Sequence, residues 1–253
     1  MANPLDMQGR MVLVTGASSG IGREIAILLS ELNARVALSG RSRERLEETL
    51  GRMSGEGHRI EPFDLNETDA IPDWIKRIAT EAGPLGGLVH SAGVANTIPV
   101  QAATTARIES LMRTNLTSAI MLAKGFRRSG CALGGSGIVL LSSISGIVGA
   151  PGISIYSASK AALIGFTRSA SLELAASGLR INCLAPAIVE TPMVDQKREM
   201  TQTHEQYEAM RRLHPLGFGR PRDVAHAAAF LLAETGRWIT GATLVVDGGY
   251  SAA

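Results

Sequence analysis

Short, mainly apolar runs alternate along the chain with longer segments whose apolar positions recur at helical spacing. Most of the short runs are apolar throughout, which is typical of parallel strands covered on both faces. The repeated order predicts an α/β fold, a doubly wound Rossmann-type parallel sheet of about seven strands with helices on both faces, in a single domain over residues 1–253. We expect strands at 11–15, 35–39, 59–63, 88–90, 138–142, 180–184 and 243–247, and the clearest helices at 21–32, 42–53, 107–128 and 156–175.

The stretch from 188 to 220 interrupts this alternation. It is more polar than its surroundings and contains one helical pattern. We therefore expect this stretch to form a lid.

Composition narrows the class of protein. Of 253 residues, 45% are hydrophobic and 19% are charged, which fits a soluble globular chain with a large core. The formal net charge is +2 and no basic block alternates with aromatic residues, so we expect no nucleic-acid partner. No run approaches the ~18 apolar residues of a membrane span. The N-terminus lacks the apolar stretch of a signal peptide, and the two cysteines, Cys131 and Cys183, do not suggest a disulfide framework, so we expect a cytoplasmic protein. Neither these cysteines nor the five histidines have the spacing of metal ligands, so we expect no metal site.

The segment TGASSGIG, residues 15–22, directly follows the first expected strand. Its glycines, Gly16, Gly20 and Gly22, would let backbone N–H groups approach a pyrophosphate at the N-terminus of the next helix. Glycines also serve ordinary turns, so the cluster alone is weak. Its position at the first strand-to-helix turn of an α/β chain favours a dinucleotide site.

The segment YSASK places Tyr156 four residues before Lys160. In a helix the two side chains share one face. Either the ring packs in the core while the lysine is solvated, or the ammonium lowers the pKa of the phenol and makes it a usable acid.

With TGASSGIG and YSASK together, the chain resembles the short-chain dehydrogenase/reductase family over residues 9–249. The resemblance implies a catalytic tetrad of Asn115 in RTNLTSA, Ser143 in LLSSISG, Tyr156 and Lys160. It implies Tyr156 as general acid or base and Ser143 as the hydroxyl that polarises a carbonyl. Lys160 would tune the phenol and bind the nicotinamide ribose, and Asn115 would hold a water of a proton relay.

The resemblance also implies contacts to a nicotinamide cofactor. Asp64 and Leu65 match residues that touch adenine, although Asp64 is equally a candidate helix cap. Val189 and Thr191 match contacts to the carboxamide. The complete set of expected cofactor contacts is Gly16, Ser18, Ser19, Gly20, Ile21, Gly22, Arg41, Asp64, Leu65, Ser91, Ala92, Gly93, Tyr156, Lys160, Val189 and Thr191.

The end of the second expected strand favours NADP(H) over NAD(H), which is not excluded. Gly40 stands where NAD enzymes carry an acid for the adenine ribose. Arg41 follows and can pair with a 2′-phosphate. Alternatively, Arg41 and Arg43 are solvated residues at a helix start, although positive charge is disfavoured there.

Three departures from the family pattern bear on the site. The usual Asn-Asn-Ala-Gly after the fourth strand reads His-Ser-Ala-Gly at 90–93. His90 is then either a hydrogen-bonded structural residue or a pH sensor, and Ser91 replaces an asparagine near the cofactor. Ala187 stands where a glycine usually follows Pro186, and Ser19 stands where many relatives carry an arginine.

The substrate class is a ketone or secondary alcohol, and the chain looks most similar to 3-oxoacyl-[acyl-carrier-protein] reductases. Sugars, polyols and cyclic ketones stay open, because the fold does not decide. So does a cofactor-binding regulator without turnover. Arg127 and Arg128 could receive an acidic acyl carrier protein, but Ser177 replaces a frequent arginine nearby. Part of the substrate pocket is expected to be apolar, and the residues expected to line it are Ile144, Ile153, Val189 and Met193.

The resemblance also implies a homotetramer. In it, helices 107–128 and 156–175 would form the dimer contact.

Overall fold

A seven-stranded parallel sheet forms the centre of the molecule, in the order β3-β2-β1-β4-β5-β6-β7. The computed structural model describes residues 3–192 and 203–252. The strand order reverses between β1 and β4, the kind of position where such sheets bind ligands beyond their carboxyl ends. The predicted fold class is therefore confirmed. The strands are β1 (Met11–Thr15), β2 (Arg35–Ser39), β3 (Arg59–Ile60), β4 (Leu85–His90), β5 (Ala132–Leu141), β6 (Arg180–Pro186) and β7 (Thr243–Val246).

Strand β1 shows why the apolar runs are continuous. Val12 and Val14 belong to one core cluster, whereas Met11 and Leu13 belong to another on the opposite face of the sheet. Successive side chains of a strand point to opposite faces, so both faces of β1 require apolar residues.

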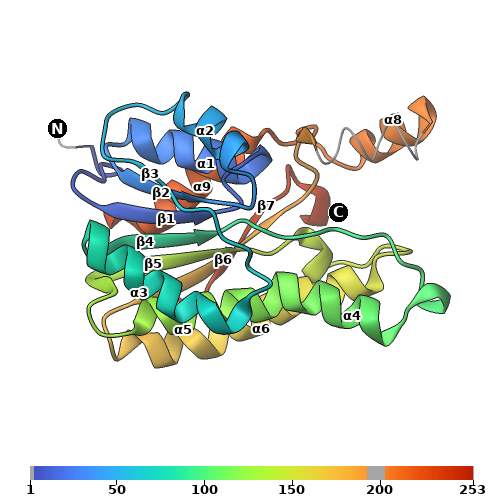
Figure 1. Ribbon diagram of the computed structural model, residues 1–253. Helices are drawn as coiled ribbons and strands as arrows, with labels where there is room; N and C mark the ends of the chain where they lie inside the picture. The colour runs from blue at the N-terminus through green and yellow to red at the C-terminus, as the bar shows by residue number, and fades with distance from the viewer. Residues whose placement is uncertain (1–2, 193–202, 253) are drawn as a thin grey trace.

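Helices cover both faces of the sheet (Figure 1). One layer holds α1 (Gly20–Glu31), α2 (Arg43–Leu50) and α9 (Pro221–Leu232), and the other holds α3 (Ile71–Ala82), α5 (Ser118–Arg127) and α6 (Ser154–Ala175). Helix α1 packs beside α9 although they lie far apart in sequence, and Arg222 of α9 pairs with Glu24 of α1 at 2.8 Å. Within the described ranges, no helix is both long and apolar enough to cross a membrane.

Two elements extend beyond the carboxyl ends of the strands, α4 (Thr105–Met112) and α8 (His204–Arg212) (Figure 1). The expected lid, 188–220, contains α8 and a β-bridge between Val189 and Gly219. Residues 193–202 of the lid, including Met193 of the expected apolar pocket, lie outside the described residues.

The third strand is shorter than predicted, because regular pairing stops after Ile60 and the run was expected to reach residue 63. Glu61 and Phe63 still donate backbone hydrogen bonds to Leu38 and Gly40 at 2.8 and 3.2 Å. Pro62, which lies between them, is tolerated because its nitrogen faces away from β2 at the open edge of the sheet, where no ladder bond would form.

The expected helix 107–128 is divided. A π-helical segment, η3 (Arg113–Thr117), separates α4 from α5. The N–H of Ser118 bonds to the carbonyl of Arg113, five residues earlier, instead of to Thr114. Such single π-turns often occur at functional sites, and this one contains Asn115.

Arg180, at the start of β6, holds the C-terminal end of α9. Its side chain is buried and its guanidinium donates to the carbonyls of Leu231, Leu232 and Gly236 at 2.7, 3.2 and 2.8 Å. These carbonyls lie where a helix end needs donors from outside the helix. A Cβ at Gly137 would lie 3.1 Å from the guanidinium, so glycine leaves the space that Arg180 fills.

We predict that Arg180→Met lowers the free energy of unfolding by about 2–3 kcal/mol, because buried carbonyls lose their donors. The melting temperature should fall by about 5–10 °C. Arg180→Lys should recover only part of this loss, because one nitrogen replaces a fork of donors. The control is Arg168→Met, since Arg168 is exposed on α6; equal melting shifts for the two methionine variants would contradict the assigned role.

Candidate active site

Tyr156 and Lys160 lie on the first turns of α6, four residues apart as the sequence predicts. Lys160 Nζ is 5.7 Å from the centre of the Tyr156 ring. The lysine side chain is buried, and its Nζ donates to the backbone carbonyl of Leu141 at 2.7 Å. The alternative in which Lys160 is a solvated surface charge is therefore wrong.

Ser143 reaches this pair because the segment after β5 lies directly against α6. A Cβ at Gly146 would lie 2.8 Å from the carbonyl carbon of Lys160, so only glycine permits this approach. Ser142 adds a hydrogen bond from its hydroxyl to the carbonyl oxygen of Lys160 at 2.8 Å. Ser143 itself is nearly buried and hydrogen-bonds to the Tyr156 side chain.

Asn115 is fully buried in η3, where both hydrogens of its amide nitrogen and one lone pair of its amide oxygen are engaged. Its Oδ1 accepts from the N–H of Val94 at 2.9 Å, and its Nδ2 donates to the Val94 carbonyl and to Ser159 Oγ, each at 3.0 Å. A Cβ at Gly93 would lie 3.2 Å from Asn115 Oδ1 and 3.4 Å from Lys160 Nζ. Asn115 and Lys160 therefore meet beside Gly93, and Tyr156 and Ser143 adjoin Lys160, so the expected tetrad is grouped in one place.

The electrostatics of the pair differ from expectation. Burial raises the pKa of Tyr156, and the hydrogen bond from Ser143 lowers it only in part. Burial also lowers the pKa of Lys160 to about 8. The expected lowering of the phenol pKa by Lys160 is not present in this arrangement, because the ammonium points at the Leu141 carbonyl and the ring itself is desolvated.

The glycine segment turns sharply between β1 and α1. Gly16 has a φ of +70°, and a Cβ there would lie 2.7 Å from the N of Ala92. A Cβ at Gly22 would lie 2.3 Å from the carbonyl oxygen of Gly16 and 3.2 Å from Ser91 Oγ. The loop is thus packed against the segment 91–93, which brings these two groups of expected cofactor contacts together.

The first turn of α1 is open to an anion. Ser19 is its N-cap residue, with φ −167°, but its side chain makes no capping hydrogen bond. The N–H groups of the first turn are therefore not satisfied by a cap, which suits a pyrophosphate beside Gly20 and Ile21. Across the loop, the Thr191 methyl carbon would lie 3.3 Å from a Cβ at Gly20, so Thr191 borders the same place.

Sequence reasoning missed Arg23, which fixes the loop from behind. Its guanidinium donates to the carbonyl of Ser18 at 2.6 Å, to Thr49 Oγ1 at 3.0 Å and to Glu48 at 2.9 Å. The only available signal was an arginine directly after the glycine motif. Because Arg23 is committed to these contacts, it adds rigidity to the loop.

Gly40 and Arg41 border the loop from the end of β2. A Cβ at Gly40 would lie 3.3 Å from Ser18 Oγ, so this position adjoins the glycine segment. Arg41 is exposed at this edge. Arg43, in contrast, lies on α2 with Glu47 3.9 Å away.

Asp64 and Leu65 lie at the far edge of the same end of the sheet. Asp64 Oδ1 accepts from the backbone N–H and the side-chain amide of Asn66, both at 3.0 Å. Asp64 therefore stabilises a turn, and its expected alternative role as a helix cap is wrong, because the next helical turn, η1 (Thr68–Ala70), begins later. Leu65 is buried, as is Val189 in its bridge to Gly219.

His90 is buried at the end of β4 and bonded through both ring nitrogens. Nδ1 is 2.8 Å from Thr15 Oγ1, and Nε2 is 3.2 Å from Ser118 Oγ. Burial lowers the pKa of His90 to about 3. The interpretation of His90 as a hydrogen-bonded structural residue is confirmed, and a role in sensing pH near neutrality is wrong.

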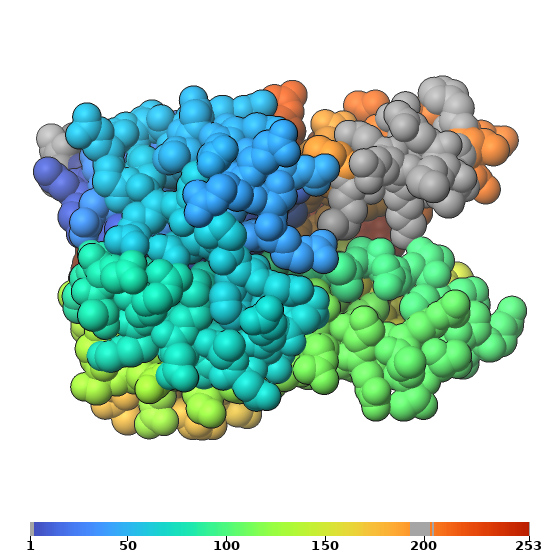
Figure 2. All heavy atoms as spheres, in the orientation of Figure 1, coloured from blue at the N-terminus to red at the C-terminus, as the bar shows by residue number. Residues whose placement is uncertain are grey.

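Together these features fit a dinucleotide. The open first turn of α1 and the glycine loop suit its pyrophosphate, and the tetrad lies at the other end of the same edge. Figure 2 shows the green surface that includes α4 extending beyond the blue and cyan surface of the first part of the chain. Across residues 3–192 and 203–252, no group of three or more His, Cys, Asp or Glu side chains could hold a metal ion.

Comparison with known proteins gives matches along nearly the whole chain. The family model described as Enoyl-(Acyl carrier protein) reductase matches residues 16–251. The chain is 35% identical to the 3-oxoacyl-[acyl-carrier-protein] reductase FabG of Rickettsia conorii over 97% of this chain and 98% of that protein. It is 36% identical to cis-4-hydroxycyclohexanecarboxylate dehydrogenase of Sinomonas cyclohexanicum, covering 96% and 97%. A solved short-chain type dehydrogenase/reductase from Mycobacterium ulcerans superimposes with a TM-score of 0.90 at 29% identity, covering 98% and 91%.

We predict that Lys160→Met stabilises the protein at pH 7 by an amount on the order of 3 kcal/mol, because a buried cation is removed. Burial lowers the pKa of Lys160 from 10.5 to about 8, so between these values the unfolded chain binds more protons than the folded protein. The wild type therefore gains stability relative to the variant as the pH rises from 8 to 10.5.

Urea unfolding of both proteins at pH 7 and at pH 10 measures this difference. Lys124→Met is the matched control, since Lys124 is exposed on α5. A stability difference between wild type and Lys160→Met that does not change with pH would contradict the prediction.

Proposed function

Because the chain belongs to the short-chain dehydrogenase/reductase family, we propose that it transfers a hydride between NADP(H) and a ketone or secondary alcohol. The proposal rests on the grouping of the tetrad around Lys160, at the edge of the sheet that also carries the glycine loop. The bound nicotinamide would supply or accept the hydride.

Tyr156 is the general acid in the reducing direction and the general base in the oxidising direction. Its hydroxyl gives a proton to the carbonyl oxygen as negative charge develops there. Ser143, which hydrogen-bonds to Tyr156, donates to the same oxygen and orients it. Because the site is buried, such a hydrogen bond stabilises developing charge more than it would in water.

Lys160 and Asn115 replace the proton that Tyr156 gives to the substrate. The Lys160 ammonium also offers hydrogens to ribose hydroxyls, and its pKa of about 8 lets it pass on a proton near neutral pH. The Asn115 amide is occupied by Val94 and Ser159, so a relay water would use the remaining lone pair of Oδ1, beside Lys160 Nζ.

The remaining expected contacts surround the cofactor. Arg41 pairs with the 2′-phosphate, and Asp64 and Leu65 border the adenine. Val189 and Thr191 hold the carboxamide, and the described parts of 188–220 act as the substrate lid. The position of Thr191 beside Gly20 supports this arrangement.

Two substrate classes deserve priority. The Rickettsia relative is named for 3-oxoacyl thioester reduction and the Sinomonas relative for oxidation of a cyclic alcohol. Both need an apolar pocket, which the buried side chains of Ile144 and Val189 support. A panel of 3-oxoacyl thioesters, cyclic ketones and ketoses, each with NADPH, decides among them.

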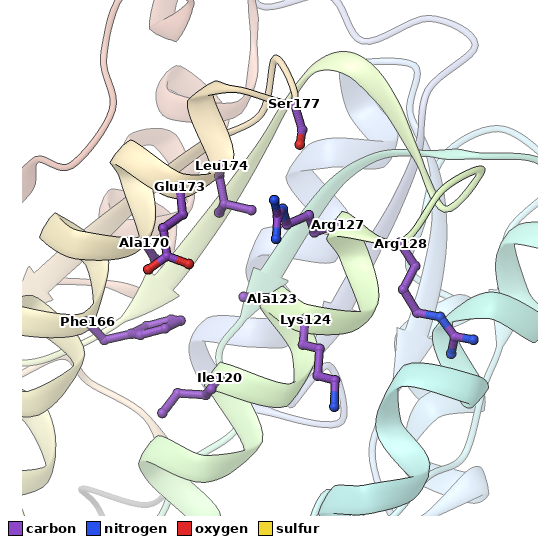
Figure 3. A pocket seen from close by; sticks show the side chains of 10 residues that line it. All are labelled: Ile120, Ala123, Lys124, Arg127, Arg128, Phe166, Ala170, Glu173, Leu174 and Ser177. Atoms are coloured by element: carbon purple, nitrogen blue, oxygen red, sulfur yellow. The ribbon is translucent and has the colours of Figure 1, made fainter.

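An acyl carrier protein would need basic residues near the site. The groove between α5 and α6 carries Lys124 and Arg127, but Glu173 lines it as well (Figure 3). Arg128 lines the groove as well, but its guanidinium pairs with Asp73 at 2.5 Å. We therefore favour a substrate that is not protein-bound. Comparing the same 3-oxoacyl group on carrier protein and on a small thiol tests this choice.

A cofactor-binding regulator without turnover is the alternative class. The complete tetrad argues against it, and any carbonyl-dependent oxidation of NADPH excludes it.

We also propose a homotetramer, which is supported by apolar side chains exposed on α5, α6 and β7, namely Ile120, Leu172, Leu244 and Val245. We propose a reducing cytoplasm as the location, which is supported by the two buried free cysteines, Cys131 and Cys183.

We predict that Tyr156→Phe lowers kcat by roughly 10²–10⁴-fold, because the ring stays and only the acid is lost. Cofactor affinity and far-UV circular dichroism should not change. Tyr250→Phe is the matched control, since the Tyr250 ring stacks on His214 outside the tetrad. A Tyr156→Phe enzyme with more than about half of the wild-type kcat would remove Tyr156 from the chemistry.

We predict tighter binding of NADP(H) than of NAD(H), and that Arg41→Ala reduces the ratio mainly by weakening NADP(H). A charge-assisted contact is worth about 1.5–3 kcal/mol, or roughly 10- to 150-fold in affinity. Because Ser19 stands where many relatives carry an arginine, we expect the preference for NADP(H) to lie near the lower end of this range of affinity ratios. Fluorescence titration of both cofactors measures the ratio, with Arg43→Ala as control; tighter NAD(H) binding by the wild type would refute the preference.

A further inference from the structure

A buried chain of polar side chains connects β1 to the π-segment η3. It runs from Thr15, through His90, to Ser118, and ends at the carbonyl oxygen of Thr114. Thr15 directly precedes the glycine loop, and Thr114 directly precedes Asn115. Thr15, His90 and Ser118 are each at most 1% exposed. The chain therefore joins the cofactor loop to the turn that carries one tetrad residue.

The hydrogen positions in this chain follow from its geometry. Ser118 has one hydroxyl hydrogen, and its Oγ lies 2.6 Å from the Thr114 carbonyl, which can only accept. Ser118 Oγ must then accept from Nε2–H of His90. This leaves Nδ1 as the acceptor for the hydroxyl of Thr15. A neutral imidazole satisfies both neighbours at once, and burial keeps His90 neutral.

The π-segment explains why the Thr114 carbonyl is available. In an α-helix this carbonyl would accept from the N–H of Ser118, four residues later. Here that N–H bonds to Arg113, so the carbonyl of Thr114 accepts from the Ser118 hydroxyl instead. The hydroxyl thus replaces the bond that would return the segment to α-helical register.

Contacts on the other side of η3 favour the same register. Thr114 Oγ1 donates to Asn66 Oδ1 at 2.9 Å, and Asn66 in turn bonds to Asp64 in the turn expected to border adenine. Asn115 is buried against Val94 and Ser159. A shift of η3 by one residue would rotate Asn115 by about 100° around the helix axis and remove it from these partners.

We propose that His90 and Ser118 are positioning residues, which hold η3 in the π-register that presents Asn115 beside Lys160. This rests on the proposed function only in assigning Asn115 to the proton supply. The link to η3 itself is a property of the folded protein and is measurable without any substrate.

The test compares Ser118→Ala with Ser136→Ala. Both serines are buried and both donate to one backbone carbonyl, Ser118 to Thr114 and Ser136 to Leu85 at 3.2 Å. Ser136 lies on β5, away from η3. Ser118→Ala is expected to lose more melting temperature than Ser136→Ala, because it also leaves Nε2–H of His90 without an acceptor, so the comparison rests on hydrogen exchange over 113–117 and on kcat.

Ser118→Ala should accelerate amide hydrogen exchange over 113–117 and lower kcat by roughly 10-fold, since small misplacements of catalytic groups are costly. Its affinity for NADPH should stay within about twofold of the wild type, because the cofactor loop is not changed. Ser136→Ala should match the wild type in exchange over 113–117 and in kcat.

Unchanged exchange over 113–117 in Ser118→Ala overturns the proposal, whatever the activity. Faster exchange with unchanged kcat overturns the positioning role while leaving the link. If no substrate on the panel is turned over by the wild type, the proposed function fails, and the exchange comparison still decides the link between His90, Ser118 and η3.

Discussion

The buried ammonium of Lys160 is the constraint on which the site depends. A cation there is unfavourable unless its hydrogens find acceptors, and the Leu141 carbonyl at 2.7 Å provides one. That acceptor is available because β5 ends beside the first turns of α6, where Gly146 and Ser142 hold the two segments together. The same contact carries Ser143 to Tyr156. The fold therefore supplies stability elsewhere, in two apolar cores, to maintain a charge that the core itself disfavours.

Close backbone approach is the second requirement. The glycine loop lies against the segment 91–93 at distances that no side chain would permit, and Arg23 holds the loop from the opposite side. The loop is thus rigid while the N–H groups at the start of α1 stay uncapped. A rigid donor array loses little conformational entropy when an anion binds.

Most helices and strands can be predicted from the sequence, because burial of one or both faces leaves a recognisable pattern of apolar residues. The runs 11–15 and 35–39 coincide with β1 and β2, since burial on both faces leaves a continuous apolar signal. The sequence over 107–128 reads as one continuous helix, so the π-turn that contains Asn115 is not predicted from it. Tyr156 and Lys160 are predictable from helical spacing, whereas Arg23 and Ser118 are not, because their partners lie on other elements. The catalytic and cofactor roles of the expected site residues remain predictions.

The pairing of α1 with α9 has a consequence for how the chain is made. Arg222 and Glu24, which join these helices, are 198 residues apart. The ribosome synthesises α1 long before α9, so the apolar side of α1 cannot pack against α9 during most of synthesis. Domains that depend on such distant pairings fold late and expose aggregation-prone apolar surface until the partner segment has been synthesised. A truncation that removes α9 would therefore leave the apolar side of α1 uncovered.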